Sequence, residues 1–177
     1  MGLKDRFKDG RDWIAKNFDI SQVRTKMSVF ETIIRFVGGF LTCYSLTGDE
    51  IFLNKSLEVA EKMLPAFNTP TGIPLSLINP STGASENYNW ASQRQSILSE
   101  IGTLHLELSY LSAVSGNPVY LEKVENIRKI LDQAVKPNGL YPNYINPQNG
   151  KWGQGEFVAK LFFYILYRTF IWRYRFN

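Results

Sequence analysis

Apolar residues recur every three or four positions in four stretches of the chain, which is the spacing of one face of an α-helix. The stretches predict helices at about residues 29–46, 50–67, 97–114 and 118–134. Gly48, after the first stretch, is typical of a helix C-cap, and Asp49, before the second, is typical of a helix N-cap. The pattern therefore predicts two αα-hairpins.

The two predicted hairpins are copies of one repeat. Residues 47–55 align with residues 115–123 at an offset of 68, and residues 78–83 align with residues 145–150 at an offset of 67. The second match contains Asn-Pro-x-x-Gly in each copy, which predicts a tight turn between two short extended arms. These turns lie in stretches rich in proline and glycine, at residues 68–90 and 136–154. Since αα repeats stack into solenoids or close into toroids, we expect an all-α fold with short β-hairpin-like loops, as part of a larger assembly of repeats.

Composition and charge narrow the class of protein. The chain has 177 residues, of which 44% are hydrophobic, and this is ordinary for a globular protein. Cys43 is the sole cysteine and His105 the sole histidine, which excludes an intrachain disulfide and the usual zinc site. His105 is expected to be a half-buried helix residue rather than a catalyst. The net charge of +4 arises at the two ends of the chain, so no basic stripe crosses the body, and nucleic-acid binding is disfavoured.

Two glutamates stand at equivalent places near the starts of two predicted helices. Glu31 lies in the first copy of the repeat, and Glu100 lies 69 residues later in the second. A carboxylate there is often only a partner of the helix dipole, and Glu31 could simply pair with Arg35 one turn on. The alternative is that Glu31, Arg35 and Glu100 line one rim, where carboxyl groups suit a sugar or a hard cation and can act as general acids. Both interpretations are open at this point.

Glycines and tryptophans give weaker signals. Gly38 and Gly39 lie inside a predicted helix, where each is unfavourable, so we expect a neighbouring element to approach the backbone closely there. Trp13, Trp90 and Trp152 could stack on sugar rings, although exposed or loop tryptophans are more often structural.

Seven segments then form an ordered set of motifs. They are SVFETIIRFVGG at 28–39, LPAFNTPTGIP at 64–74, and the segments 90–92, 96–100, 102–107, 139–144 and 151–154. Together they resemble the motifs of the class I α-1,2-mannosidases, glycoside hydrolase family 47, and the residues are most similar to those of the Golgi subgroup. The resemblance runs from about residue 9 to residue 154. We therefore expect residues 1–154 to be a partial catalytic domain of that family, and residues 155–177 to be a divergent basic and aromatic tail.

The resemblance carries expectations for fold, chemistry and location. It implies an (αα)₇ barrel that holds a calcium ion, and an inverting reaction that trims α-1,2-linked mannose from mannose-rich N-glycans. It implies that Glu31 is the proton donor and that Arg35 and Glu100 contact the sugar. It also implies a Golgi or endoplasmic reticulum membrane protein that works on the lumenal side.

The end of the chain departs from the family pattern. From Gly155 onward the sequence has no counterpart of the family's aspartate that serves the catalytic centre, nor of the threonine that anchors calcium. Since an inverting glycosidase needs an acid and a base on opposite sides of the bond, we expect this truncated chain to be inactive and marginally stable. The alternative function is a non-catalytic fragment that binds mannose-rich glycans or another partner.

Targeting signals are weak. The start of the chain has no apolar stretch of the secretory kind, and four basic residues interrupt residues 158–176, which predicts no membrane span. The chain as written is therefore expected in the cytoplasm, with at most a weak membrane-surface contact through the tail. Asn54-Lys55-Ser56 fits the N-glycosylation pattern, but it lies inside a predicted helix and requires a lumenal location. The pattern does not indicate an oligomeric state.

Overall fold

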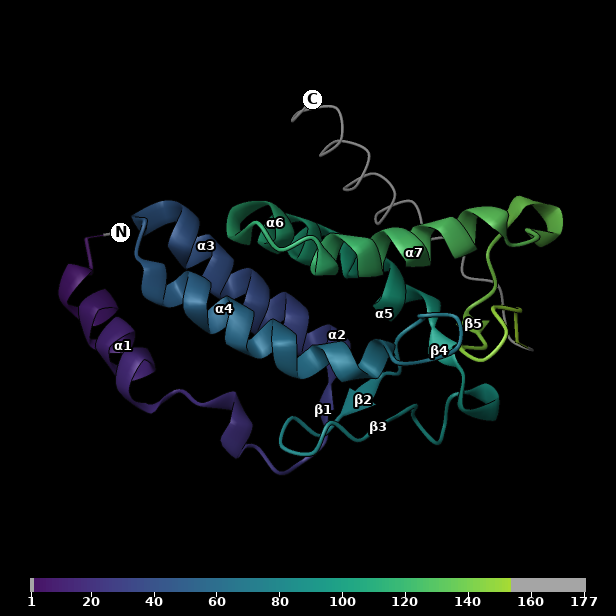
Figure 1. Ribbon diagram of the computed structural model, residues 1–177, viewed down its shortest axis with the longest axis horizontal. Coiled ribbons are helices and arrows are strands. Elements are labelled where there is room, and N and C mark those ends of the chain that lie inside the picture. The colour runs from purple at the N-terminus through teal and green to yellow at the C-terminus, as the bar shows by residue number, and fades with distance from the viewer. Residues whose placement is uncertain (1, 154–177) are drawn as a thin grey trace.

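Two αα-hairpins lie beside each other, and short strands gather at one end of both (Figure 1). This computed structural model describes residues 2–153. The helices are α1 (Lys4–Asn17), α2 (Val29–Thr32), α3 (Gly38–Thr47), α4 (Glu50–Met63), α5 (Leu98–Thr103), α6 (His105–Ser115) and α7 (Val119–Gln133). The strands are β1 (Met27–Ser28), β2 (Leu77–Ile78), β3 (Ser85–Glu86), β4 (Ser96–Ile97) and β5 (Tyr144–Ile145). The tail expected at residues 155–177 lies outside the described residues.

The first hairpin is one long helix followed by α4. The long helix passes from α2 through a π-helical turn at Ile33–Val37 into α3, which confirms the helix predicted at 29–46. Gly48 ends it in a left-handed conformation with φ of 70°, which a glycine adopts without a steric penalty. The side chain of Asp49 accepts a hydrogen bond from the backbone N–H of Ile51 and so caps α4. Both predicted caps are confirmed.

Two predicted helices are interrupted in the structure. The helix predicted at 97–114 is divided at Leu104, which separates α5 from α6. The helix predicted at 50–67 ends as an α-helix at Met63 and continues as a 3₁₀ turn, because Pro65 has no N–H for an α-helical hydrogen bond. The predicted hairpins are therefore confirmed, with local breaks that the apolar spacing does not reveal.

The hydrophobic pattern does not predict α1. None of the residues of this helix is buried, because only one side of it touches the rest of the chain. The Nε atom of Arg11 donates a hydrogen bond of 2.8 Å to Oδ2 of Asp49, and the rings of Phe7 and Phe52 lie 5.9 Å apart between centroids. These contacts hold α1 against the start of α4, so Asp49 serves two helices.

The strands repeat the same pairing in both copies. Met27 in β1 pairs with Ile78 in β2, and Ile78 also pairs with Ser85 in β3. In the second copy Ser96 in β4 pairs with Ile145 in β5. Each first helix is thus preceded by a two-residue strand that pairs antiparallel with the arm of a later turn.

The two Asn-Pro-x-x-Gly turns have the same geometry. The backbone N–H of Gly83 donates to the carbonyl of Asn79 at 2.8 Å, and the N–H of Gly150 donates to the carbonyl of Asn146 at 2.8 Å. The two glycines have φ of 73° and 70°, in the left-handed region that this turn requires. The predicted tight turns between short extended arms are confirmed.

The two hairpins share one hydrophobic core. Its fully buried members come from both hairpins and include Ile33, Val37, Val59, Leu104, Leu108, Leu111, Tyr120 and Ile127. A Cβ atom on Gly38 would lie 3.2 Å from Cγ of Glu107, which confirms the predicted close approach of a neighbouring element. The same prediction is wrong for Gly39, which is exposed and has no described heavy atom outside its own helix within 4 Å of that position.

The helix from Val29 to Thr47 is long and apolar enough to cross a membrane, by length and composition alone. Its inward side chains Ile33 and Val37 are fully buried in the core that the two hairpins share. Packing in the core therefore accounts for the apolar composition of this helix.

We expect Asp49→Ala to lower the free energy of unfolding by about 0.5–2 kcal/mol, because it removes the N-cap of α4 and the partner of Arg11. Asp49→Asn keeps an oxygen that can accept from Ile51 but removes the charge, so it should retain most of the stability. Urea denaturation of both variants measures the difference. An equal loss in the two variants would show that the charge, rather than the cap, supplies the stabilisation.

Candidate functional site

The helix starts that carry Glu31 and Glu100 lie at the same end of the two hairpins, where the strands gather (Figure 1). At the start of α2 the backbone N–H of Val29 donates to the carbonyl of Ser76 at 2.9 Å. At the start of α5 the N–H of Leu98 donates to the carbonyl of Asn143 at 2.8 Å. Because both helices are fixed in the same way, each glutamate lies in the first turn of its helix at an equivalent place.

Glu31 is held by its own helix. Its backbone N–H donates to Oγ of Ser28 at 3.2 Å, which makes Ser28 the N-cap of α2. Its carboxylate accepts a hydrogen bond from Nε of Arg35, one turn along the helix. The expected ion pair is therefore present, yet the side chain of Arg35 stays 69% exposed and that of Glu31 46% exposed. Both groups remain accessible from solvent at the rim.

Glu100 has a different environment. It is half-buried and lines a small hollow, about large enough for one water molecule, together with Ser76, Val29, Phe30 and further apolar residues of α5 and its neighbourhood. Within residues 2–153, neither Oε2 of Glu100 nor Oγ of Ser76 has a hydrogen-bond partner, although both atoms are buried. The hydroxyls of Ser76 and Tyr88 lie close enough to act on the Glu100 carboxyl group, but Oε2 accepts no hydrogen bond of ordinary geometry, which is unfavourable for a buried oxygen.

The environment of Glu100 includes the charge of Glu31. Burial raises the pKa of Glu100 above its ordinary value, and the negative charge of Glu31 raises it further. The nearby hydroxyls of Ser76 and Tyr88 act in the opposite direction. Tyr88 has a raised pKa as well, mainly because it is buried and partly because both carboxylates repel its ionised form. Glu31, Glu100, Ser76 and Tyr88 therefore form one electrostatic cluster.

The sequence pattern does not single out Asn87 or Tyr88. Both lie on the loop between β3 and β4, where no periodicity marks them. Asn87 is buried, and its Oδ1 accepts from the backbone N–H of Ser76 at 2.8 Å while its Nδ2 donates to the carbonyl of Arg94 at 2.8 Å. This side chain closes the loop from residue 87 to residue 94 and holds Ser76 beside Glu100.

The closed loop displays an aromatic pair. Trp90 is 67% exposed and stacks on Tyr88, with 5.0 Å between ring centroids and 22° between ring planes. Gln93 and Arg94 at the end of the loop have φ of 51° and 54°, in the left-handed region that residues with a Cβ atom rarely adopt. Of the three tryptophans named from the sequence, Trp90 is therefore the one beside the acids.

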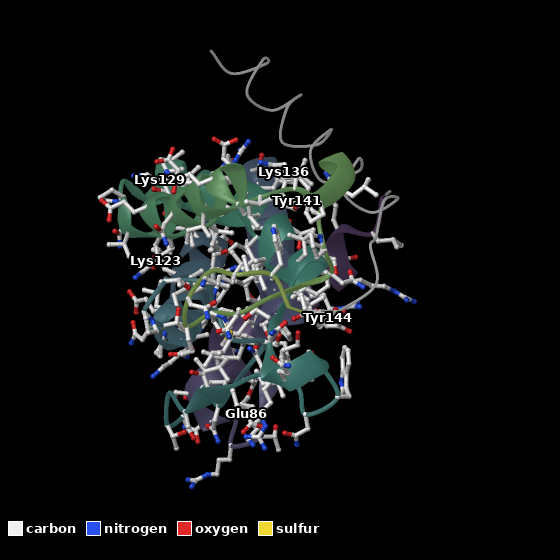
Figure 2. The ribbon with its side chains drawn as sticks, turned by 90° about the vertical axis from the view of Figure 1, so that its right-hand side faces the viewer. Glu86, Lys123, Lys129, Lys136, Tyr141 and Tyr144 are labelled. Carbon is white, nitrogen blue, oxygen red and sulfur yellow. The ribbon has the colours of Figure 1, made fainter. Side chains whose placement is uncertain are left out.

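The other two tryptophans and the histidine lie elsewhere. Trp13 is exposed on α1. Trp152 is a structural aromatic, because its Nε1 donates to the carbonyl of Val135 and its ring packs edge-on against Tyr141. The Nζ atom of Lys136 lies over the ring of Tyr141, 5.2 Å from its centroid (Figure 2). His105 is half-buried on α6, as predicted, and its Nε2 lies 3.1 Å from Nη1 of Arg128 on α7.

The described residues do not build a metal cage. Between residues 2 and 153, no three His, Cys, Asp or Glu side chains lie close enough together to hold a metal ion. Calcium takes about six to eight oxygen ligands, and Glu31 is instead paired with Arg35. The described residues therefore offer no cluster of carboxylates for the calcium ion that the resemblance implies.

Comparisons with known proteins agree on one family. The model of glycosyl hydrolase family 47 matches residues 1–161. The chain is 58% identical over 154 residues to mannosyl-oligosaccharide alpha-1,2-mannosidase IA of Spodoptera frugiperda, and 54% identical over 154 residues to mannosyl-oligosaccharide 1,2-alpha-mannosidase IB of Homo sapiens. Both alignments cover 87% of this chain but only 23% and 24% of the two relatives. The chain thus spans about a quarter of the length of the curated relatives that it matches.

Solved structures give the same fold. The alpha-1,2-mannosidase from Trichoderma reesei superposes with a TM-score of 0.74 at 24% identity, over 87% of this chain and 35% of that one. A sugar epimerase from a ruminal bacterium superposes with a TM-score of 0.58 at 14% identity, over 82% of this chain and 35% of that one. The fold is that of part of an (αα)₇ barrel, which confirms the expected fold class.

We expect Gln93→Gly to raise the free energy of unfolding by about 1 kcal/mol, because glycine adopts the left-handed conformation without strain. Lys129→Gly is the matched control, since Lys129 lies exposed on α7 (Figure 2) with ordinary helical backbone, where glycine costs about 1 kcal/mol. Chemical denaturation compares the two. Destabilisation by both variants would mean that the loop conformation at Gln93 carries no strain.

We expect Glu100→Gln to raise the midpoint of thermal unfolding at pH 7, by about 2–4 °C for each 1 kcal/mol of desolvation that it relieves. The pKa of Glu100 is raised in the folded chain, so its contribution to stability is present below the ordinary carboxyl pKa. That contribution is lost as the pH rises through the raised value. The advantage of the variant should therefore shrink to nothing in acid. A difference that is the same at every pH would assign the effect to shape rather than to charge.

Proposed function

Because the chain belongs to glycosyl hydrolase family 47, we propose that it supplies part of a site that removes α-1,2-linked mannose from mannose-rich N-glycans, in the lumen of the Golgi or endoplasmic reticulum. We propose also that these 177 residues alone do not hydrolyse the glycan. The observation that carries this proposal is the placement of Glu31 and Glu100 at the same end of the two hairpins. They lie at equivalent helix starts, close enough for the charge of one to raise the pKa of the other. Most glycoside hydrolases use carboxyl groups that lie beside the glycosidic bond as the acid and the base of the reaction.

Glu31 is proposed as the proton donor. In this role its carboxyl group gives a proton to the glycosidic oxygen while the bond from that oxygen to the anomeric carbon breaks, and water attacks the carbon from the opposite face. Arg35 holds the Glu31 carboxylate through Nε and keeps most of its guanidinium in solvent. Five N–H groups in a planar fork are suited to bind sugar hydroxyls and to orient the acid at the same time.

Glu100 is proposed to contact the sugar rather than to activate the water. Its buried Oε2 lacks a donor among the described residues, and a sugar hydroxyl that reached this hollow would supply one. An inverting hydrolase needs its two catalytic carboxyl groups roughly 6.5–9.5 Å apart with a water between them. Ser76 and Tyr88 occupy the surroundings of Glu100. The catalytic base is therefore proposed to come from elsewhere in the family's barrel.

No residue is proposed here as a calcium ligand. Family membership fits a calcium cofactor, but the part of the chain that the structure describes gathers no ligand set for it. The roles proposed above are roles of Glu31, Arg35 and Glu100 themselves.

Binding without hydrolysis is the second candidate function of this chain. The exposure of Arg35 and of Trp90 favours it, since Arg35 pairs with Glu31 and Trp90 stacks on Tyr88 in the acid cluster. A guanidinium that donates to hydroxyls and an aromatic face that packs on the apolar side of a sugar are the two contacts that carbohydrate recognition combines. Neither contact requires a catalytic base.

We expect the purified 177-residue chain to bind a mannose-rich oligosaccharide but to release no mannose from α-1,2-mannobiose. Arg35→Ala and Trp90→Ala should each weaken binding by about 5- to 10-fold, because each removes one exposed contact. Trp13→Ala is the control, since Trp13 is equally exposed but lies on α1. Calorimetry measures binding, and chromatography of released mannose measures hydrolysis.

Hydrolysis that Glu31→Gln reduces by about 10²- to 10⁴-fold would overturn the inactivity of the chain while it supports the role of Glu31. Binding that is unchanged in both rim variants would exclude these residues as glycan contacts. The absence of both binding and hydrolysis would refute the glycan-binding function of this chain.

A further inference from the structure

Asn54 on α4 has no part in the function proposed above. It is the one asparagine in the 177-residue sequence that is followed by a residue other than proline and then by serine or threonine, which is the acceptor pattern for N-glycosylation. Asn79 has a serine two places later, but Pro80 lies between and excludes it. The pattern therefore points to a single acceptor in this chain.

The folded helix separates the two halves of the acceptor. Asn54 is exposed, whereas Ser56 is 0% exposed and its Oγ donates to the carbonyl of Phe52 at 2.9 Å. Each helical residue turns the chain by about 100°, so residues two apart point about 160° away from each other. A transferase that reads the asparagine amide and the serine hydroxyl together cannot find both on one side of α4.

A glycan on Asn54 is nevertheless compatible with the folded chain. Asn54 lies in the second turn of α4, which begins at the end of the hairpin away from the strands (Figure 1). It shares the exposed side of the helix with Glu50 and Glu61, while the core residues of α4 face the other way. A sugar chain there would extend into solvent at a distance from Glu31 and Glu100.

We propose that Asn54 accepts an N-glycan before α4 folds, and that the folded helix is no longer a substrate for the transfer. The amide Nδ2 of Asn54 attacks the anomeric carbon of an oligosaccharide carried on a lipid pyrophosphate. The bond from that carbon to the pyrophosphate oxygen breaks, the lipid pyrophosphate leaves, and the amide loses one proton. The inference rests on the proposed function in one respect, which is the lumenal location.

The test is translation of the full chain behind a cleavable signal sequence in the presence of endoplasmic reticulum microsomes. We expect one shift in electrophoretic mobility that endoglycosidase treatment removes. Asn54→Gln and Ser56→Ala should both abolish the shift. Asn17→Gln, an exposed asparagine outside the acceptor pattern, should leave it unchanged. No shift in the unmodified sequence, or a shift that survives Asn54→Gln, would overturn the proposal.

A second arm tests the order of events. The purified, unglycosylated chain is offered to solubilised transferase and lipid-linked donor, first folded and then unfolded in urea and diluted into the reaction. We expect transfer to the freshly diluted chain to exceed transfer to the folded chain by at least about 10-fold. Equal transfer would overturn the requirement for an unfolded α4.

The two proposals fail separately. A chain that is glycosylated at Asn54 but binds no mannose-rich glycan would refute the proposed function alone. A chain that binds the glycan but is never modified would refute this inference alone.

Discussion

The site depends on one backbone constraint that the chain uses twice. The first N–H groups of a helix have no partner within the helix, and here one of them is bound by a carbonyl from a later loop. Val29 is fixed by Ser76 in the first repeat, and Leu98 by Asn143 in the second. In each repeat the strand before the helix pairs with the strand that follows the carbonyl residue, and this pairing sets which carbonyl meets the helix start. Both helix starts are fixed at one end of the hairpins. The third residue of each helix, Glu31 in α2 and Glu100 in α5, therefore lies at that same end.

Equivalent positions do not give the two glutamates equivalent environments. The backbone N–H of Glu31 is bound by Ser28, and its carboxylate is paired with Arg35 and about half exposed to water. Glu100 forms no ion pair with another described residue, and burial raises its pKa. Two carboxyl groups with different surroundings can take different roles, so equivalent places in the repeat do not imply equivalent chemistry.

The parts of this structure that the sequence predicts are those that local chemistry determines. Gly48 and Asp49 act within a few residues of themselves, and so do the Asn-Pro-x-x-Gly turns, so their types and spacing suffice. Gly38 and Gly39 look alike in the sequence, yet only Gly38 meets Glu107 from another helix. The sequence could not separate them, because that contact joins residues far apart along the chain. The apolar pattern fails to predict α1 for the same reason, because this helix is held by a few contacts to α4 and most of its residues are charged.

The least predictable part of the site is also its most strained part. Asn87 is a buried polar residue whose three hydrogen bonds join the loop to Ser76, Arg94 and Ser96. These bonds stabilise a loop whose last residues adopt left-handed conformations, and they place Tyr88 beside both acids. Strained backbone persists only where the surrounding contacts hold it, and such places concentrate at functional sites. The helix starts therefore supply the acids through local rules, whereas the loop between β3 and β4 brings the hydroxyl and the aromatic face to them through contacts that only the folded chain contains.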